Sequence, residues 1–483
     1  MSVNLSIFEL SSKNRLEVSK EYFSEDSYQR KLESIFTRYP SVQKVPFGDA
    51  YKPGLDNIRK FASLLGDPQC QYRTIHVAGT NGKGSVASML ASALSSVGLK
   101  VGLYTSPHIE DFRERARVIL PASIVHQPVP GPVEGPFYLV PKEYVFDFLC
   151  RYEKDMDNLD LSFFEITTGL AFKWFAEERV DVAVIEVGLG GRLDSTNIIT
   201  PDLSVITSIA FDHCALLGNT LEEIASEKAG IFKPGIPALV GEYLPETRPV
   251  FEKKAREVVC NLFFAQDMVP SLWNLSGQLL GSMDLRGKYQ SKNLRTVLAA
   301  VDILKENPFY CGLGNDDAVE DAIIHAAERT GFHGRWEKLS SDPLVIADIG
   351  HNPAALKENF SQLEEMMSTG DYSSLIIVYA VMADKDLDGI MPLMPTCATY
   401  IFTNPKTRRA LPGEDLTAAY KSYCSSSGKP VDRILSAPSV EEALKLAFDL
   451  AKEGKPLIYL GGSTYLVSEA VEILTAQGKV QGF

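Results

Sequence analysis

Cysteine is scarce in this chain of 483 residues: the seven cysteines are scattered, and no two of them form a Cys-x-x-Cys pair. This spacing excludes a disulfide framework. An odd number of cysteines in a long chain is typical of proteins whose thiols stay reduced. We therefore expect the protein to be cytoplasmic.

Long apolar segments are lacking too. No stretch approaches the roughly 18 consecutive apolar residues that can span a membrane. The region 1–22 is mixed and charged, without the apolar core of a secretory signal peptide. We therefore expect neither a membrane segment nor a membrane partner.

Basic residues are in deficit, with 48 Lys+Arg against 62 Asp+Glu and a formal net charge of −14. A protein that binds a nucleic-acid backbone needs a basic face, so this balance argues against a nucleic-acid partner. Small anionic ligands stay open, because a helix N-terminus and a few local cations can hold them.

Short apolar, β-branched segments alternate along the chain with segments of helical periodicity, which predicts an α/β fold with parallel sheets. The predicted strands are 74–78, 101–104, 181–187, 203–209, 344–349, 374–381, 399–403 and 456–460. The predicted helices are 84–97, 163–178, 221–229, 292–306, 354–365 and 439–453.

The length favours two or three domains. A helical pattern ends near 328–335, where strand-like sequence resumes. We therefore predict an N-terminal domain at 1–332 and a smaller α/β domain at 333–483. The proline- and glycine-rich segment 121–141 is predicted to be an extended loop or an edge hairpin.

A glycine-rich turn joins the first predicted strand to the first predicted helix; it consists of Gly79, Thr80, Asn81, Gly82, Lys83, Gly84 and Ser85. Backbone N–H groups and a helix dipole bind anions at such a place. Lys83 would supply a mobile positive charge for the outer phosphates of ATP, and Ser85 a hydroxyl for phosphate or metal. The generic phosphate-loop pattern has glycine in place of Val77 and Ser or Thr in place of Gly84, so an ordinary glycine-rich turn stays the alternative.

The loop GTNGKGS and the segment YTSPH at 104–108 resemble the folylpolyglutamate synthase/dihydrofolate synthase family of ATP-dependent Mur-type ligases. The resemblance continues in the family's order through AYKPGLDNI at 50–58, FFEITTGLAF at 163–172, VIEVGLGGRLDSTN at 184–197, FDH at 211–213, EKAGIFK at 227–233, HGRWE at 333–337, DIGHNP at 348–353, MADKD at 382–386 and GGSTYLVSE at 461–469. It implies a P-loop-like ATP-binding domain on a parallel sheet, a smaller Rossmann-like glutamate-ligase domain, and an active site in the cleft between them.

Two side chains at predicted strand ends are candidate metal ligands. Glu186 and His213 lie where ligands collect in open α/β sheets. A buried carboxylate needs a partner or a metal, whereas a lone histidine at a strand end is more often a structural hydrogen-bonding residue, and Mg²⁺ prefers oxygen ligands. The resemblance implies that Ser106, Glu186 and His213 surround one Mg²⁺, and the loop adds the hydroxyl of Ser85.

The resemblance also implies a second Mg²⁺, bridged by the carbamate that CO₂ forms on Lys228. Carbamylation needs the neutral amine, whereas a free lysine titrates near about 10.4, so a partly buried site that lowers the pKa is required. Without the resemblance, a lysine beside Glu227 would be interpreted as part of a solvated helix face. A monovalent cation is a further candidate cofactor.

Several further residues are assigned to ATP. The resemblance implies that Asp348 contacts the ribose side and His351 the phosphates, with Asn352 in the same turn. Arg335 matches the family's phosphate-binding arginine, a role that suits a planar bidentate donor, although a surface arginine is the alternative.

An amide pair on the helix predicted at 292–306 and the turn before it could recognise adenine. Asn293 follows Gln290 by one turn, and helix caps or solvated amides are the alternative. Family analogy alone assigns Lys385 to the acyl phosphate or to glutamate.

The predicted function is that of an ATP- and Mg²⁺-dependent ligase that adds L-glutamate to folates, and also to dihydropteroate, through an acyl phosphate. The folate-binding candidates are Tyr104, Thr105, Pro107 and His108, and the catalytic candidates are Lys83, Lys228, His351 and Lys385. We expect a monomer whose partners are small molecules.

Two alternatives stay open. A sister ligase that acts on a cell-wall UDP-sugar peptide precursor would share the loop, but AYKPGLDNI and YTSPH argue against it. A non-catalytic nucleotide-binding protein would use the loop as a switch, but it would not need the blocks after residue 333.

Overall fold

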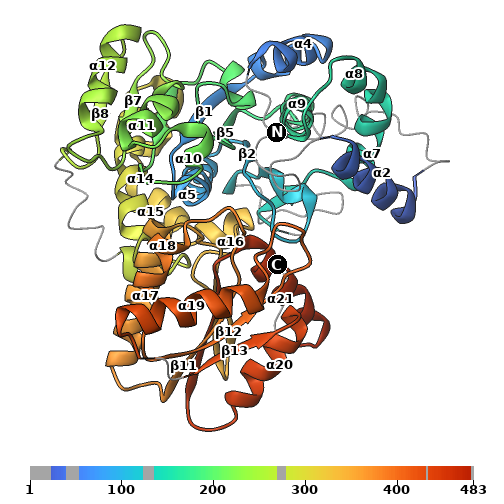
Figure 1. The fold of residues 1–483 in the computed structure, drawn as a ribbon. Helices are drawn as coiled ribbons and strands as arrows, with labels where there is room; N and C mark the ends of the chain where they lie inside the picture. The colour runs from blue at the N-terminus through green and yellow to red at the C-terminus, as the bar shows by residue number, and fades with distance from the viewer. Residues whose placement is uncertain (1–22, 40–53, 123–134, 269–278, 431–432, 480–483) are drawn as a thin grey trace. The chain divides into compact units, whose positions relative to one another are not determined.

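The computed structural model describes residues 23–39, 54–122, 135–268, 279–430 and 433–479 (Figure 1). The chain divides into two compact units, Met1–Asp284 with Lys292–Phe332, and Leu285–Ser291 with His333–Phe483. No sequence pattern indicates that 285–291 joins the second unit. Within the described ranges, no helix has the length and apolar character needed to cross a bilayer. All seven cysteines are free thiols.

The first unit is built on an eight-stranded sheet in the order β4-β3-β2-β5-β1-β6-β7-β8. Its strands are β1 (Arg73–Ala78), β2 (Val101–Tyr104), β3 (Ala116–Ile119), β4 (Phe137–Leu139), β5 (Val182–Glu186), β6 (Leu203–Ile206), β7 (Ala238–Val240) and β8 (Leu262–Phe264). All neighbours are parallel except β2–β3 and β3–β4 at one edge. The expected α/β fold is therefore confirmed, with mostly rather than wholly parallel strands.

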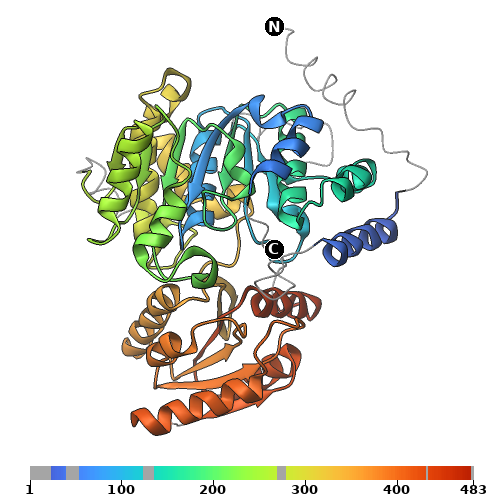
Figure 2. The ribbon, with the colours of Figure 1, turned by 45° about the horizontal axis from the view of Figure 1, so that its top comes forward.

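The second unit has a six-stranded sheet in the order β13-β12-β11-β14-β10-β9. Its strands are β9 (Glu337–Ser341), β10 (Leu344–Asp348), β11 (Ser374–Tyr379), β12 (Ala398–Thr403), β13 (Ile434–Ala437) and β14 (Pro456–Gly461). Only β9 runs antiparallel to its neighbour. The strands lie between helices (Figure 2).

Helices follow most strands in both units. Those of the first unit are α2 (Glu25–Arg38), α4 (Asp56–Leu64), α5 (Lys83–Ser96), α7 (Lys142–Arg151), α8 (Glu153–Asn158), α9 (Phe163–Glu177), α10 (Cys214–Leu217), α11 (Leu221–Ala229), α12 (Arg248–Val258), α15 (Asp316–Ile324) and α16 (Ala326–Thr330). Those of the second unit are α17 (Pro353–Ser368), α18 (Leu387–Ile390), α19 (Gly413–Ser427), α20 (Val440–Leu450) and α21 (Thr464–Ala476), and α14 (Gln290–Leu304) begins in the second unit and continues in the first.

The proline-rich segment 121–141 is only partly described, because 123–134 lie outside the described residues. Its last residues form β4, the edge strand of the first sheet. An edge position tolerates proline nearby, because one side of the strand needs no ladder hydrogen bonds.

Two helices cover the centre of the first sheet and fix the direction of its side chains. Ile185 of β5 belongs to the same apolar core as Phe172 of α9. Successive strand residues point to opposite faces, so Glu186 points to the other face, where α5 packs. There a Cβ added to Gly84 would lie 3.5 Å from Glu186 Oε2.

His76 lies on the central strand β1 and is fully buried. Its Nε2 lies 2.9 Å from Thr196 Oγ1. Burial, with a smaller contribution from the charge of Lys233, lowers the pKa of His76 to about 3. The folded protein therefore keeps this imidazole neutral at a pH where the unfolded chain protonates it.

We expect this group to make the protein sensitive to acid. Between about pH 6.5 and pH 3 the unfolded state binds the extra proton, so the free energy of unfolding falls as the pH falls through this range. Glutamine does not titrate, so His76→Gln should show a shallower loss, by about 3 kcal/mol at the acid end. Urea unfolding of both proteins at pH 7, 6, 5 and 4 measures the difference; parallel curves would contradict it.

Candidate active site

The glycine-rich turn is held by the segment that follows β6. Thr80 donates its backbone N–H to Ser208 O at 2.7 Å, and its hydroxyl donates to Ala210 O at 3.1 Å. The hydroxyls of Thr207 and Ser208 both donate to Asn81 O, at 2.6 and 3.1 Å. The ends of neighbouring strands β1 and β6 thus fix the path of the loop.

Two glycines of the turn are required by close contacts. Gly79 has φ 148°, and a Cβ on it would lie 1.9 Å from Thr207 Oγ1. Gly82 has φ 87°, and a Cβ on it would lie 2.1 Å from the side-chain oxygen of Asn293. The structure therefore brings the buried Asn293 of α14 against the loop.

Two lysines converge on the same carbonyl of the loop. Lys83, the first residue of α5, donates from Nζ to Gly79 O and Thr80 O, each at 3.1 Å. Lys228 of α11 donates from Nζ to Gly79 O at 2.9 Å. Both amines therefore lie near the N-terminal end of α5, where a helix binds anions.

Lys228 is buried, which rules out the interpretation of this lysine as part of a solvated helix face. Its helix is packed through Ile224, Ala225 and Ala229, which are also buried. Burial first, and then the nearby charge of Lys83, lower the pKa of Lys228 to about 7. A large share of this amine is therefore neutral near pH 7.

Glu186 brings the end of β5 to the first turn of α5. Its Oε2 accepts from the backbone N–H of Ser106 at 3.2 Å, and it lies close to Gly84. Ser85, the next residue of that turn, is buried. Glu186, Ser106 and the start of α5 therefore lie together, as expected for the carboxyl ends of strands in such sheets.

These oxygen atoms fit a magnesium ion that shares its coordination with phosphate. Among the residues the structure describes, no three His, Cys, Asp or Glu side chains form a cage for a metal. Mg²⁺ keeps several waters and is usually bound by one or two carboxylates together with substrate phosphates, so Glu186 and neighbouring hydroxyls suffice. His213 follows the β6 segment, in a left-handed conformation, with Nε2 3.8 Å from Asp212 Oδ2.

The segment predicted to bind folate follows β2. Tyr104 is fully buried, and its hydroxyl lies 3.2 Å from the hydroxyls of both Thr167 and Thr168 of α9. Thr105 is also buried, whereas Pro107 is exposed and His108 half-buried. Tyr104 therefore supports the segment from the core, and the later residues are the accessible ones.

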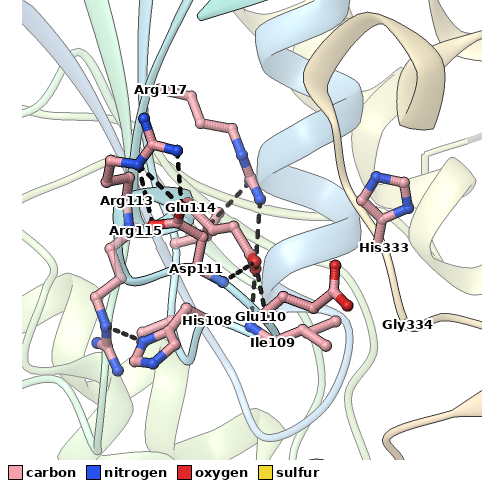
Figure 3. Close-up of polar contacts among 12 residues, drawn as sticks. His108, Ile109, Glu110, Asp111, Arg113, Glu114, Arg115, Arg117, His333 and Gly334 are labelled. Atoms are coloured by element: carbon pink, nitrogen blue, oxygen red, sulfur yellow. Dashed lines mark hydrogen bonds and ion pairs between the residues drawn. The ribbon is translucent and has the colours of Figure 1, made fainter. Parts of the chain in front are cut away.

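An aromatic cluster surrounds His108. Its ring centre lies 6.0 Å from that of Phe36 and 6.1 Å from that of Phe112. Phe36 in turn stacks on Phe163, with ring centres 4.9 Å apart. Arg115 donates from Nε to Nδ1 of His108 at 2.8 Å, as Figure 3 shows. Planar apolar faces next to polar donors suit a planar, hydrogen-bonding ligand.

The second unit places its candidates around the end of β10. Asp348 ends this strand, and the ring nitrogen Nδ1 of His351 lies 3.1 Å from Ile349 O. Asn352 caps α17 by accepting from the backbone N–H of Ala355 at 3.0 Å. The turn that bears His351 is therefore fixed on both sides.

The remaining candidates of this unit differ in exposure. Arg335 is half-buried and donates from Nη1 to Gly334 O at 3.2 Å. Lys385 is half-buried in a turn, where its backbone N–H donates to Met382 O at 3.1 Å. Gln290 is fully buried at the start of α14.

Comparison with known proteins follows this geometry. The model of the Mur ligase glutamate-ligase domain matches residues 334–463. A dihydrofolate synthase/folylpolyglutamate synthase of Bacillus subtilis is 32% identical over 468 residues, which cover 90% of this chain and 99% of that protein. The chain belongs to the folylpolyglutamate synthase/dihydrofolate synthase family.

Solved structures agree with this membership. E. coli FolC in complex with DHPP and ADP matches with a TM-score of 0.72 and 27% identity, over 89% of this chain and 95% of that one. A bifunctional folylpolyglutamate synthase/dihydrofolate synthase from Yersinia pestis, complexed with AMPPNP and a Mn ion, matches with a TM-score of 0.71 and 25% identity, over 90% and 95%. The predicted family, fold class and enzyme class, an ATP-dependent ligase, are confirmed.

Sequence reasoning missed the residues of this ligase that support its site from a distance. Thr207 and Ser208 were placed within a predicted strand, and their role in holding the loop was not predicted. The signal that could have indicated it is that both are polar and lie at the end of a strand. Asp348 has four hydrogen-bond donors that no pattern indicates: Oδ2 accepts from Tyr289 Oη at 2.7 Å and Trp336 N at 2.8 Å, and Oδ1 accepts from Gly350 N at 2.7 Å and Asn359 Nδ2 at 2.8 Å.

We expect Asp348→Asn to destabilise the second unit. Its buried carboxylate meets four donors, and asparagine would turn an NH₂ group toward some of them. Leaving buried donors unpaired costs about 2–4 kcal/mol, or about 5–10 °C in thermal unfolding midpoint. Calorimetry of Asp348→Asn and of the exposed control Asp342→Asn measures it; equal midpoints would contradict the prediction.

Proposed function

We propose that the loop at 79–85 binds the triphosphate of ATP and that Lys83 contacts its outer phosphates. The chain is an ATP-dependent ligase that adds L-glutamate to folates. One observation carries the assignment of the site: Lys83, Lys228 and Glu186 converge on a single loop at the carboxyl edge of the sheet. Phosphoryl transfer needs charge neutralisation and positioning above all, and this arrangement offers both.

The reaction begins at the acceptor's carboxylate, which is a poor electrophile. A carboxylate oxygen attacks the γ-phosphorus of ATP, the bond to the bridging oxygen breaks, and ADP leaves with its electrons. The amine of L-glutamate then attacks the acyl carbon, loses a proton, and expels inorganic phosphate to leave an amide. Lys83 compensates the negative charge of the transferred group while loop N–H groups hold the β-phosphate.

Metal ions complete the charge balance in this proposal. Ser85, Ser106, Glu186 and His213 would hold one Mg²⁺, and a carbamate on Lys228 would hold a second. When bound, Mg²⁺ neutralises charge on the transferred phosphoryl group. The Mn ion in the Yersinia pestis relative supports a divalent ion. The buried Lys228 amine, with its lowered pKa, supports reaction with CO₂, because the neutral amine is the nucleophile.

The aromatic cluster is the proposed acceptor site. The half-buried rings of Phe36 and His108 pack on the buried Phe112 and Phe163, and His108 follows Thr105 and Pro107 in the chain. The complex of E. coli FolC with DHPP and ADP supports binding of a pteroyl-type acceptor together with nucleotide. Folates and dihydropteroate are both proposed acceptors.

Residues 1–332 are the proposed ATP-binding domain and 333–483 the glutamate-ligase domain. Asn293, which lies against Gly82, is the proposed adenine-contacting residue. Arg335 and His351 are proposed for phosphate, and Lys385 for the acyl phosphate or glutamate. Asp348, proposed on the ribose side, also holds the turn that bears His351. The free thiols support a cytosolic location. A monomer and a monovalent cation as a further cofactor belong to the proposal as well.

Acceptor-dependent release of ADP tests the function. Purified protein receives Mg-ATP and L-glutamate with either tetrahydrofolate or dihydropteroate, and mass spectrometry identifies each product. We expect ADP release to depend on the acceptor and each product to gain one glutamate or more. ADP release without any dependence on either acceptor would contradict the proposal.

A further inference from the structure

Arginines occupy three alternate positions after the segment 104–108 that was predicted to bind folate: Arg113, Arg115 and Arg117. Arg113 forms a close ion pair, with Nε and Nη2 2.9 and 2.7 Å from Asp111 Oδ2. Arg115 donates to His108. Arg117, on β3, has its described carboxylate partner, Glu114, only at 4.0 Å.

The guanidinium of Arg117 is buried with little compensation, because its side chain is only 3% exposed. Nη1 donates to Thr105 Oγ1 at 3.3 Å, and Nη2 lies 4.0 Å from Glu114 Oε2. Nε has no hydrogen-bond partner in the described part of the chain. Within the described residues, a group with five N–H donors thus makes one long hydrogen bond and one distant ion pair.

Glu114 is held elsewhere and does not approach Arg117 more closely. Its Oε1 accepts from the backbone N–H groups of Glu110 and Asp111 at 2.8 and 2.7 Å, and its Oε2 from that of Ile109 at 2.8 Å. Figure 3 shows these bonds gathered on the Glu114 carboxylate below Arg117. The Glu114 carboxylate therefore shapes the segment and does not pair closely with Arg117.

Arg117 lies on the same face of the first sheet as Glu186. Ala116 and Val118 belong to the same core as Ile185, so Arg117 and Glu186 both point to the opposite face of the sheet, two strands apart in the order β3-β2-β5. Burial lowers the pKa of Arg117 to about 10, and the charges of Glu114 and Glu186 oppose this shift. The side chain is therefore a cation near neutral pH.

We propose that Arg117 binds the carboxylate of the acceptor acid, the group that is phosphorylated. A buried cation is costly unless an anion completes it, and the guanidinium fork matches a carboxylate in bidentate geometry. The loop and Lys83 are proposed for the triphosphate and Lys385 for the acyl phosphate or glutamate, so no cation has yet been assigned to the unreacted carboxylate of the acceptor. This inference rests on the proposed function, because it takes the acceptor from it.

A comparison of an acid with its amide isolates this contact. Binding of dihydropteroate and of its carboxamide is measured by calorimetry, in the presence of ADP, for the native protein, Arg117→Gln and Arg113→Gln. We expect the native protein to prefer the acid by about tenfold or more, as a charge-assisted pair gives. Arg117→Gln should lose that preference and keep its affinity for the amide. Arg113→Gln, whose native arginine is paired with Asp111, should keep the preference.

The outcomes distinguish an Arg117 that binds the acceptor's carboxylate from one that is purely structural. A full acid preference in Arg117→Gln would overturn the subsite, because a purely structural arginine would not change the ratio. If Arg117→Gln does not fold, Arg117→Lys keeps the charge without the fork, and we expect a several-fold weaker affinity for the acid at an unchanged affinity for ADP; an unchanged acid affinity would overturn the subsite. Failure of the native protein to bind either compound would overturn the proposed function and the subsite with it.

Discussion

Lys83→Ala is expected to lower kcat by about a thousandfold, because it removes the mobile cation nearest the proposed γ-phosphate. The Nζ of Lys83 contacts only the loop carbonyls Gly79 O and Thr80 O among its described hydrogen-bond partners. A cation at a helix N-terminus is unfavourable for the helix dipole. The substitution should therefore leave stability unchanged or slightly higher, which separates loss of function from loss of fold.

Single-turnover formation of ADP with tetrahydrofolate measures this effect, and thermal unfolding checks the fold. Lys100→Ala is the matched control, because Lys100 follows the far end of α5 and pairs with Glu178 at 2.9 Å. The control should keep its turnover. A kcat of Lys83→Ala within tenfold of the native value, at equal stability, would remove this lysine from phosphoryl transfer.

Local sequence patterns predicted the centre of both sheets, because long β-branched runs such as 182–186 and 374–379 can only be buried strands in this alternation. The edge strands β8 (Leu262–Phe264) and β9 (Glu337–Ser341) contain no such run, because β8 has only three residues and β9 is polar at four of its five positions. At the antiparallel edge of the first sheet, β4 lies in the segment 121–141 that was predicted to be an extended loop or an edge hairpin, whereas β3, which carries Arg117 among its four residues, was not predicted.

In the site, too, the features formed by one continuous segment could be predicted, whereas contacts between distant segments could not. The glycine-rich loop at 79–85 joins a strand to a helix within one continuous segment, so this strand–turn–helix arrangement could be predicted. The hydroxyl of Thr207 that holds it lies 126 residues away from Asn81, and no local pattern reports such a contact. Glu186 was expected to need a partner on burial grounds, but only the fold shows that this partner is the backbone N–H of Ser106.

Lys228 is the residue for which three-dimensional packing changes the interpretation most. Its neighbour Glu227 is paired with Arg192 on the outer side of the helix, whereas Lys228 points under the loop. Helical periodicity alone does not show which of the two side chains is buried, because α11 is short and has a narrow apolar face. Burial of the amine, and not its sequence context, makes reaction with CO₂ chemically reasonable.

Removal of CO₂ is therefore expected to lower the activity at least tenfold, and added bicarbonate to restore it. With a pKa of about 7, the Lys228 amine is protonated below pH 7 and neutral above it. The extent of restoration should rise between pH 6 and 8 and then level off, whereas a lysine titrating near about 10.4 would continue to gain above pH 9. Initial rates in degassed buffers, with and without bicarbonate, give this profile.

Lys228→Met is expected to lose activity by about a thousandfold, because methionine cannot form the carbamate that completes the proposed second metal site. Carbon-13 NMR with labelled bicarbonate should show a carbamate signal in the native protein and none in Lys228→Met. Lys233→Met is the matched control: Lys233 is also a lysine whose pKa burial lowers, to about 8, but its Nζ donates to Asn197 O, away from the loop. A signal that disappears in the control but persists in Lys228→Met would assign the carbamate to Lys233. Full activity in buffer free of CO₂ would show that the unmodified amine, hydrogen-bonded to Gly79 O, is the active form.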